Sequence, residues 1–198
     1  SRYLEHLVRW QPDLILILGW YFNVPRQVRV IAARGCVGLH ASLLPKYRGG
    51  APLVWAIIHG EPRTGITLFH LEDEIDAGDI VAQQDFVLDE YDTCATAYEK
   101  AADASVKILR TALPQLADGT APRIPQDHSA ATQFPQRRPE DGLIDWDWSP
   151  QRIRNFIRSQ TRPYPGAFFY AGGKKITLWD ADIIEKEDRR PKTFTLRQ

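Results

Sequence analysis

A histidine and an aspartate in the first half of the chain are the residues whose surroundings indicate chemistry. His40 ends an apolar run that begins at Cys36, and Asp76 lies in an acidic loop after the β-rich run from Gly65 to Leu71. Side chains at the carboxyl ends of neighbouring strands meet at one edge of an α/β sheet, so we expect the imidazole and the carboxylate to come together. Such a carboxylate favours the protonated imidazole and fixes its tautomer, which suits a base that takes a proton from an amine or water.

The spacing of this pair also has a purely structural interpretation. A histidine at a strand end is often only hydrogen-bonded, and the acidic cluster from Glu72 to Asp79 could be a solvated loop. Motifs of this size carry a real false-positive risk, so spacing alone does not decide between the two interpretations.

The loop after His40 brings a rigid proline, paired glycines and positive charge next to this pair. It runs from Ser42 to Gly50, and Pro52 then occupies a place that the first turn of a helix tolerates. We expect a short apolar helix from Leu53 to His59, ended by Gly60 in the left-handed conformation.

Two long segments surround these residues, HASLLPKYRGGAP and TGITLFHLEDEIDAGDI. Both closely resemble the folate-dependent formyltransferases, the family that includes methionyl-tRNA formyltransferase and the nucleotide-sugar N-formyltransferases. The earlier PDLILILGWYF and the later RRPEDGLIDWDWS and RPYPGAFFY resemble further parts of the family, so the resemblance covers nearly the whole chain.

The resemblance implies that His40 is the general acid/base and that Asp76, at the DAGD position, supports it. The family has an oxyanion-stabilising asparagine two residues before the histidine, where this chain has Gly38. Loss of one oxyanion donor commonly costs on the order of a hundredfold to a thousandfold in rate, so the resemblance implies reduced activity unless another donor serves. The candidates are a backbone N–H, protonated His40 and Asn23.

The resemblance also implies a co-substrate, N10-formyltetrahydrofolate, and places for both substrates. The folate would lie against a strand end and the acidic loop, at Phe22, Asn23, Val24, Glu72, Asp73, Glu74 and Ile75. The candidates on the acceptor side are Ser42, Tyr47, Arg48 and Arg162. Core packing for Trp20, Tyr21 and Phe22, loop anchoring for Tyr47 and Arg48, and a surface salt bridge for Arg162 are the structural alternatives. We expect no metal site.

Composition limits the class of protein. Lys plus Arg and Asp plus Glu both number 25 among 198 residues, which argues against a nucleic-acid partner. Two cysteines are too few for a disulfide framework, so we expect a cytoplasmic protein. No apolar segment approaches the length needed to span a membrane.

The alternation of strand and helix patterns predicts an α/β fold with a Rossmann-like parallel sheet. Its first clear strand matches a late strand of the family fold, so we expect the N-terminal units to be missing. We expect the catalytic domain over residues 1–117, an extended connection over 118–138 and a small C-terminal α+β subdomain over 139–198. Besides the parts named above, the expected elements are a helix end at Leu4–Trp10, strands at Asp13–Leu18 and Asp79–Val87, helices at Pro25–Arg34, Thr93–Leu116 (capped by Asp92) and Pro150–Ser159, and a hairpin of Ala167–Tyr170 and Lys175–Trp179.

We therefore predict transfer of a formyl group to a primary amine, with a nucleotide-linked amino sugar as the favoured acceptor. Methionyl-tRNA formyltransferase is the nearest alternative, but its family carries a larger basic C-terminal domain, whereas the tail from Ala181 mixes acidic and basic residues. A weakened folate- or nucleotide-binding module and a folate-dependent hydrolase stay open as well. The apolar hairpin predicts a homodimer.

Overall fold

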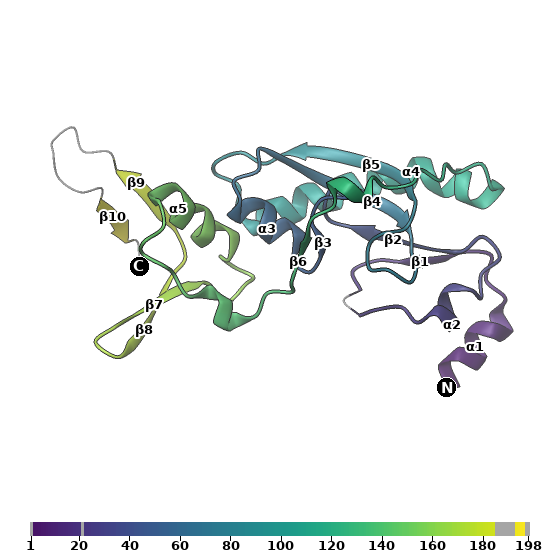
Figure 1. Ribbon diagram of the computed structural model, residues 1–198, viewed down its shortest axis with the longest axis horizontal. Helices are drawn as coiled ribbons and strands as arrows, with labels where there is room; N and C mark the ends of the chain where they lie inside the picture. Colours follow the sequence, from purple (N-terminus) through teal and green to yellow (C-terminus); the bar gives the residue numbers. More distant parts are fainter. Residues whose placement is uncertain (1, 21, 185–192, 197–198) are drawn as a thin grey trace.

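A mixed sheet forms the centre of the computed structural model, which describes residues 2–20, 22–184 and 193–196 (Figure 1). In that part of the chain the sheet has four strands in the order β1 (Ile15–Ile17), β2 (Cys36–His40), β4 (Arg63–His70) and β5 (Ile80–Val87). The expected α/β class is confirmed. Within this four-stranded sheet only β1 and β2 run parallel, however, since β4 is antiparallel to both β2 and β5.

The remaining elements follow the expected order. The helices are α1 (Arg2–Trp10), α2 (Arg26–Arg29), α3 (Pro52–Ile58), α4 (Cys94–Asp118) and α5 (Pro150–Ser159), with 3-10 turns at His128–Ala130 and Pro139–Gly142. The other strands are β3 (Arg48–Gly49), β6 (Gln133–Phe134), β7 (Ala167–Ala171), β8 (Lys174–Leu178), β9 (Ala181–Ile184) and β10 (Thr193–Leu196). Pro52 and Pro150 open their helices, and Gly60 has a φ of 70°, as the sequence predicts.

Two sequence-based expectations about helices are wrong. The helix expected over Pro25–Arg34 ends at Arg29, and α2 buries none of its residues, so no packed face stabilises a longer helix. The N-cap of α4 is Thr93, whose side chain accepts a hydrogen bond from the Thr96 amide. Asp92 accepts hydrogen bonds from the Thr96 hydroxyl and from Lys100 instead.

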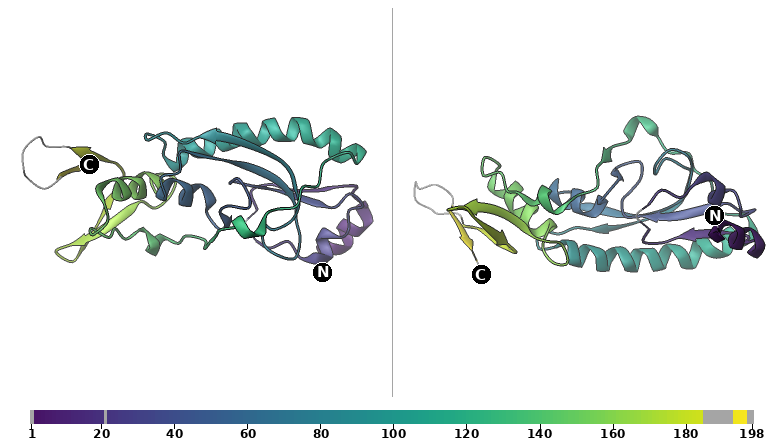
Figure 2. Two further views of the ribbon diagram at one scale, coloured as in Figure 1. Left: turned by 45° about the horizontal axis from the view of Figure 1, so that its top comes forward. Right: turned by 90° about the horizontal axis from the view of Figure 1, so that it is seen from below.

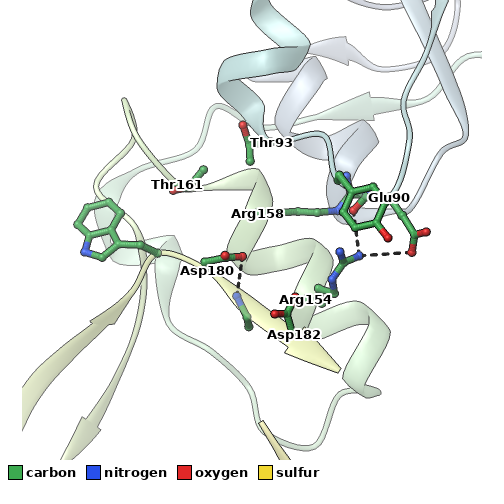
Figure 3. A pocket seen from close by; sticks show the side chains of 10 residues that line it. Glu90, Thr93, Arg154, Arg158, Thr161, Asp180 and Asp182 are labelled. Atoms are coloured by element: carbon green, nitrogen blue, oxygen red, sulfur yellow. Dashed lines mark hydrogen bonds and ion pairs between the residues drawn. The ribbon is translucent and has the colours of Figure 1, made fainter. Parts of the chain in front are cut away.

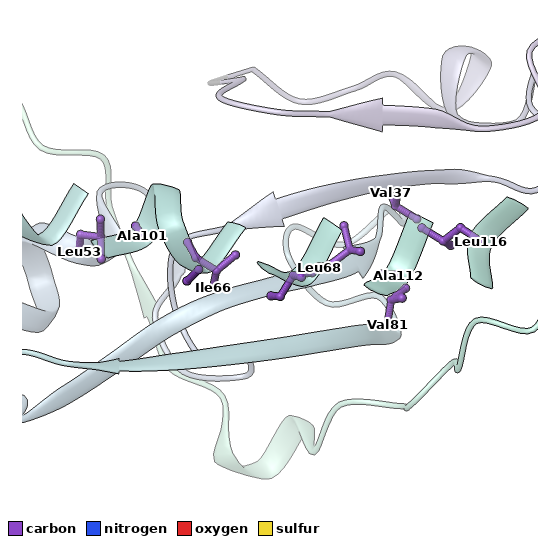
Figure 4. Close-up of a cluster of buried hydrophobic side chains, with 10 residues drawn as sticks. Val37, Leu53, Ile66, Leu68, Val81, Ala101, Ala112 and Leu116 are labelled. Atoms are coloured by element: carbon purple, nitrogen blue, oxygen red, sulfur yellow. The ribbon is translucent and has the colours of Figure 1, made fainter. Parts of the chain in front are cut away.

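Helix α4 covers one face of the sheet, and this determines which way each side chain of β2 points. Figure 4 shows Val37, Leu68 and Ala112 in the buried cluster between the strands and α4. Because successive side chains of a strand alternate between its faces, Gly38 and His40 lie on the opposite face. The catalytic candidate therefore faces away from the main core.

The connection after α4 passes over that opposite face. Figure 2 shows α4 along one side of the sheet and the 3-10 turn His128–Ala130 on the other. The connection is anchored where Ile124 bridges Ile80 and where β6 pairs in parallel with β3. The segment that reads as a simple link between domains thus contacts the loop that follows His40.

The C-terminal part packs around α5. Ile153, Phe156 and Ile157 of α5 share a buried cluster with Val54 and Ile58 of α3. The hairpin of β7 and β8 turns at Gly172 and Gly173, as expected. The tryptophans of this part contact different partners: Trp146 lies against Phe169, Trp148 against Phe156, and Arg162 covers Trp179.

Candidate active site

His40 and Asp76 come together on the face of the sheet opposite α4. Nδ1 of His40 lies 3.6 Å from Oδ2 of Asp76, and both side chains are largely buried. The other ring nitrogen, Nε2, lies 2.7 Å from the carbonyl oxygen of Tyr47. Because a carbonyl only accepts, Nε2 carries the hydrogen, and the lone pair of the neutral ring is on Nδ1, facing Asp76.

The loop from β4 to β5 brings Asp76 to this place by folding back over the sheet. Since β4 is antiparallel to β2, the expectation that parallel strand ends deliver both residues is wrong. Asp76 takes a φ of 53°, and Gly78 passes so close to β4 that a Cβ there would lie 2.0 Å from the His70 carbonyl oxygen. A left-handed aspartate and a glycine without space for a side chain therefore shape this return.

The acceptor-side candidates in the loop after β2 make hydrogen bonds within the protein. Ser42 is buried and donates to the Lys46 carbonyl at 2.7 Å. Tyr47 takes a φ of 60°, and its hydroxyl donates to Glu61 at 2.7 Å. Burial, together with the hydrogen bond and charge of Glu61, raises the pKa of Tyr47, so the hydroxyl stays a donor. These contacts fix the loop.

Arg48 is buried and joins the loop that follows His40, Ser42 to Gly50, to the acidic loop and to the connection after α4. Its guanidinium donates to Oε1 of Gln126 at 2.8 and 3.2 Å and forms an ion pair with Glu74 at 3.3 Å. The amide group of Gln126 donates in turn to the carbonyl oxygens of Asp76 and Gly78, at 2.9 and 2.8 Å. One buried glutamine thus connects three segments around the site.

Leu71 lies beside Gly38, the position at which the resemblance implies an oxyanion-stabilising asparagine. A Cβ on Gly38 would lie 3.2 Å from Cδ2 of Leu71, a contact tighter than most in proteins. Leu71 packs against the small cluster of Leu44, Phe69 and Ile80 on the His40 face. An asparagine at residue 38 would therefore need Leu71 to move.

The two segments expected to hold folate are joined by Arg29. Its guanidinium donates to the carbonyl oxygens of Val24, at 3.0 Å, and Leu71, at 3.4 Å, and forms an ion pair with Asp73. Phe22 and Asn23 are exposed, with Phe22 edge-on to Trp20, while Val24 is buried; Tyr21 is outside the described residues. In the acidic loop Glu72 is exposed, Ile75 is 52% exposed, and Glu74 pairs with Arg48.

A cavity of about 510 Å³ lies beside Arg29, on the loop that leads to Asp76. It is lined by Arg26, Arg29, Val30, Gly35, Cys36, His70, Leu71, Glu72, Asp73, Glu74 and Arg123. Its volume is in the range of small-molecule sites, and backbone carbonyls and carboxylates on its walls can accept hydrogen bonds from a heterocycle with amino groups.

Arg162 lies apart from this cavity, in the C-terminal part. Its guanidinium is 5.0 Å from the ring centroid of Trp179. Trp179 lines a second cavity, of about 350 Å³, in which Arg154 and Arg158 of α5 lie near Glu90 (Figure 3). Among the described residues, no hydrogen bond or ion pair joins Arg162 to the His40 pair or to the acidic loop.

Sequence reasoning missed the residues of the connection that reach the site. Gln126, Thr132 and Phe134 carry no motif, and their segment has no periodicity. The glycine pair Gly49 and Gly50 was the available signal, because Cβ atoms there would lie 2.3 Å from the backbone of Phe134 and Gln136. Such glycines indicate a close approach of another chain segment.

A metal-binding cluster and a membrane-spanning helix are both absent over residues 2–20, 22–184 and 193–196. In these ranges no cluster of three or more histidine, cysteine, aspartate or glutamate side chains is arranged to hold a metal ion. None of the helices in the same ranges combines the length and apolarity needed to cross a membrane.

Comparison with known proteins identifies the fold. A family model described as formyl transferase matches residues 2–113, and one described as formyl transferase, C-terminal domain, matches residues 137–194. The structure is similar to methionyl-tRNA formyltransferase from Clostridium thermocellum, with 26% identity and a TM-score of 0.74 over 98% of this chain and 82% of that one.

Two further solved structures extend the comparison. HypX from Aquifex aeolicus in complex with tetrahydrofolic acid has 25% identity and a TM-score of 0.76, over 93% of this chain but only 32% of HypX. A 4-N formyltransferase from Francisella tularensis has 21% identity and a TM-score of 0.79, over 89% of this chain and 73% of that one, a likeness that shows the fold alone. Because the first family model spans more than half of the residues, this protein belongs to the formyl transferase family, which uses formyl-tetrahydrofolate as its one-carbon donor.

Proposed function

We propose that this protein transfers a formyl group from N10-formyltetrahydrofolate to the amine of a nucleotide-linked amino sugar. The observation that carries the transfer is the buried pair of His40 and Asp76, with Nδ1 and Oδ2 3.6 Å apart. A base that faces a carboxylate in a largely buried site is suited to accept a proton and to return it.

The proposed reaction moves one proton and one acyl group. The amine nitrogen bonds to the formyl carbon, and Nδ1 of His40 takes the proton that the amine loses. The bond between this carbon and N10 then breaks, and the proton on Nδ1 passes to N10, so the reaction is balanced. Asp76 stabilises the imidazolium that forms in between, while the Tyr47 carbonyl keeps the hydrogen on Nε2.

The folate position is supported by the cavity beside Arg29. The donor would lie between the segment of Phe22, Asn23 and Val24 and the loop from Glu72 to Ile75, whose walls Arg29 holds together. Asn23 is exposed and precedes Val24, whose carbonyl oxygen accepts from Arg29, and its side chain is the donor that we propose for the formyl oxygen in place of an asparagine at residue 38.

The acceptor is supported by charge and by loop position. Residues 139–184 contain six basic and six acidic side chains, and a balanced surface supplies little of the phosphate-binding energy that a tRNA acceptor needs. The loop from Ser42 to Gly50, with Tyr47 and Arg48, would border the sugar. Arg162, which lies over Trp179, would contact a phosphate. Methionyl-tRNA is the second candidate acceptor, supported by 26% identity to the Clostridium thermocellum enzyme.

The test is tetrahydrofolate release from N10-formyltetrahydrofolate with a panel of nucleotide-linked amino sugars and with methionyl-tRNA. We expect release that depends on an amino sugar and is lost in His40→Ala. Release only with methionyl-tRNA would replace the acceptor, and formate release without any acceptor would indicate a hydrolase. Folate binding without turnover under every condition would leave a binding module.

Compartment and assembly belong to the same proposal. Cys36 and Cys94 are both free and buried thiols, which is consistent with a reducing cytoplasm. The hairpin exposes Tyr170 and Ile176, and we expect a homodimer through this surface, which light scattering can test.

A further inference from the structure

We propose that the connection between the two parts of the chain is a wall of the active site, and that Gln126 is a positioning residue for Asp76. This inference rests on the proposed role of the His40 pair. It goes beyond that role because it assigns a function to residues 118–138, which lie between the expected catalytic and C-terminal units and, apart from Arg137 and Arg138, outside both family matches.

Gln126 makes four hydrogen bonds from a buried position. The side-chain amide donates to the carbonyl oxygens of Asp76, at 2.9 Å, and Gly78, at 2.8 Å, while Oε1 accepts twice from Arg48. Gln126 is only 6% exposed, so water cannot easily replace these partners. Every polar atom of the side chain is used to hold the loops on either side of the site.

The two carbonyls that Gln126 binds belong to the strained part of the acidic loop. Asp76 has a φ of 53°, a left-handed conformation that is strained for a residue with a side chain and persists only where neighbours hold it. The bonds from Gln126 fall on this residue and on Gly78, the point of closest approach to β4. Removing them would free the backbone that aims the carboxylate at Nδ1.

The same segment also holds the partner of the other imidazole nitrogen. The Tyr47 amide donates to the Thr132 hydroxyl at 2.9 Å, and Phe134 stacks on the Tyr47 ring with centroids 5.2 Å apart. Tyr47 in turn presents its carbonyl to Nε2 at 2.7 Å. The connection therefore fixes both neighbours of the His40 ring, Asp76 through Gln126 and Tyr47 through Thr132 and Phe134.

The deciding experiment follows the His40 ring by NMR in full-length protein with isotope-labelled histidine, assigned with His40→Ala. The test variants are Gln126→Ala and the near-isosteric Gln126→Met, and Gln115→Ala is the control, an exposed glutamine of α4 outside the connection. We expect both Gln126 variants to shift the His40 Nδ1 resonance and the control to leave it unchanged. In the Asp76→Ala background, Gln126→Met should cause no further shift.

Turnover provides a second readout. Because a misplacement of about 1 Å can cost on the order of a hundredfold, Gln126→Met should lower kcat about tenfold to a hundredfold with little change in KM for the donor. In an Asp76→Asn chain the same change should cost less than about twofold, since the two residues act as one unit.

The results that would overturn the inference are specific. An unchanged His40 resonance in a folded Gln126→Met protein, or an equal shift with and without Asp76, would show that Gln126 does not act through the carboxylate. An equal kcat loss in both backgrounds would do the same. Absence of turnover in the unaltered chain would refute the proposed function, while the NMR result would still decide the role of Gln126.

Discussion

The amide of Gly49 donates a hydrogen bond of 2.8 Å to the same oxygen of Asp76 that lies 3.6 Å from Nδ1 of His40. The glycine-containing loop therefore holds the carboxylate oxygen that faces the imidazole. Gly49 has a φ of 90°, and a Cβ there would lie 2.3 Å from the Phe134 carbonyl oxygen. The loop of Gly49, the acidic loop of Asp76 and the connection at Phe134 are distant in sequence, and all three thus meet at Gly49.

Removing the charge of Asp76 tests the proposed proton transfer. Asp76→Asn keeps an oxygen that can accept from Gly49 but no longer stabilises the imidazolium, so kcat should fall about a hundredfold or more. Steady-state tetrahydrofolate release measures this loss. Asp79→Asn is the matched control, because Asp79 lies in the same loop as Asp76 but pairs with Arg123 of the connection. An equal fall of kcat in that variant would contradict the assignment.

Restoring the family asparagine should fail unless space is made for it. Gly38→Asn forces Leu71 aside and should destabilise the protein by about 1–3 kcal/mol, the usual cost of overpacking. The double change of Gly38→Asn with Leu71→Ala should recover the stability in part and raise kcat above that of Gly38→Asn. Urea denaturation and turnover of all three proteins measure both effects. A fully stable single variant would show that Leu71 does not fill this position.

The return of the acidic loop depends on Gly78. In Gly78→Ala the new Cβ would overlap the His70 carbonyl oxygen, so the loop must move and take Asp76 with it. We expect activity to be lost together with about 2 kcal/mol or more of stability. Gly172→Ala is the control, because that position has open space and bears only the cost of its positive φ, about 1 kcal/mol. Similar activity in the two variants would be evidence against this account.

Asp92 should make stability depend on pH in the acid range. Burial alone raises the pKa of its carboxyl, but hydrogen bonds from Lys100, Thr96 and the Asp89 amide outweigh it, so the pKa is lowered overall. A group with a lower pKa in the folded state stabilises the fold above its unfolded value of about 4 and loses this contribution as the pH falls through the folded value.

The measurement for Asp92 is the free energy of unfolding in urea at neutral and acid pH. Asp92→Asn should cost about 1–3 kcal/mol near pH 7 because partners of a buried group are left unsatisfied. The deficit should shrink near pH 3. A deficit that is the same at both pH values would mean that charge is not the cause.

The two cysteines should resist modification in the folded protein. Burial raises the pKa of Cys36 to about 11 and that of Cys94 to about 12, so almost no thiolate is present at pH 8. We expect iodoacetamide to label neither until the protein unfolds. Mass spectrometry after brief labelling, with and without urea, measures this, and rapid labelling of native Cys36 would show that the cavity it lines opens readily.

The sequence predicted the local elements well because their signals are local. Pro52 and Gly60 bound α3, Ser149 caps α5, and the hairpin turns at the glycine pair. The direction of β4 was not predictable in this way, since a buried apolar run has the same composition in a parallel and in an antiparallel pair. The helix expected up to Arg34 failed for lack of tertiary packing, which no short window contains.

The candidate site was predictable only in part, for a similar reason. His40 and Asp76 stand in motifs, and the structure brings them together by a path that those motifs do not encode. Gln126 contributes through its place in three dimensions, because its hydrogen bonds span 48 to 78 positions of sequence. A residue of common type in an irregular segment offers no pattern from which such a role can be inferred.

The parallel pairing of β3 with β6 has a consequence for recombination within this family. The two family models match residues 2–113 and 137–194, so a chimera joined between them would draw its linker from either parent. A linker from another member would bring foreign residues against Gly49, Tyr47 and Asp76. Crossovers placed after Arg138 keep the connection with its own catalytic half. Crossovers near Asp118 would replace the linker residues that contact Tyr47, Gly49 and Asp76.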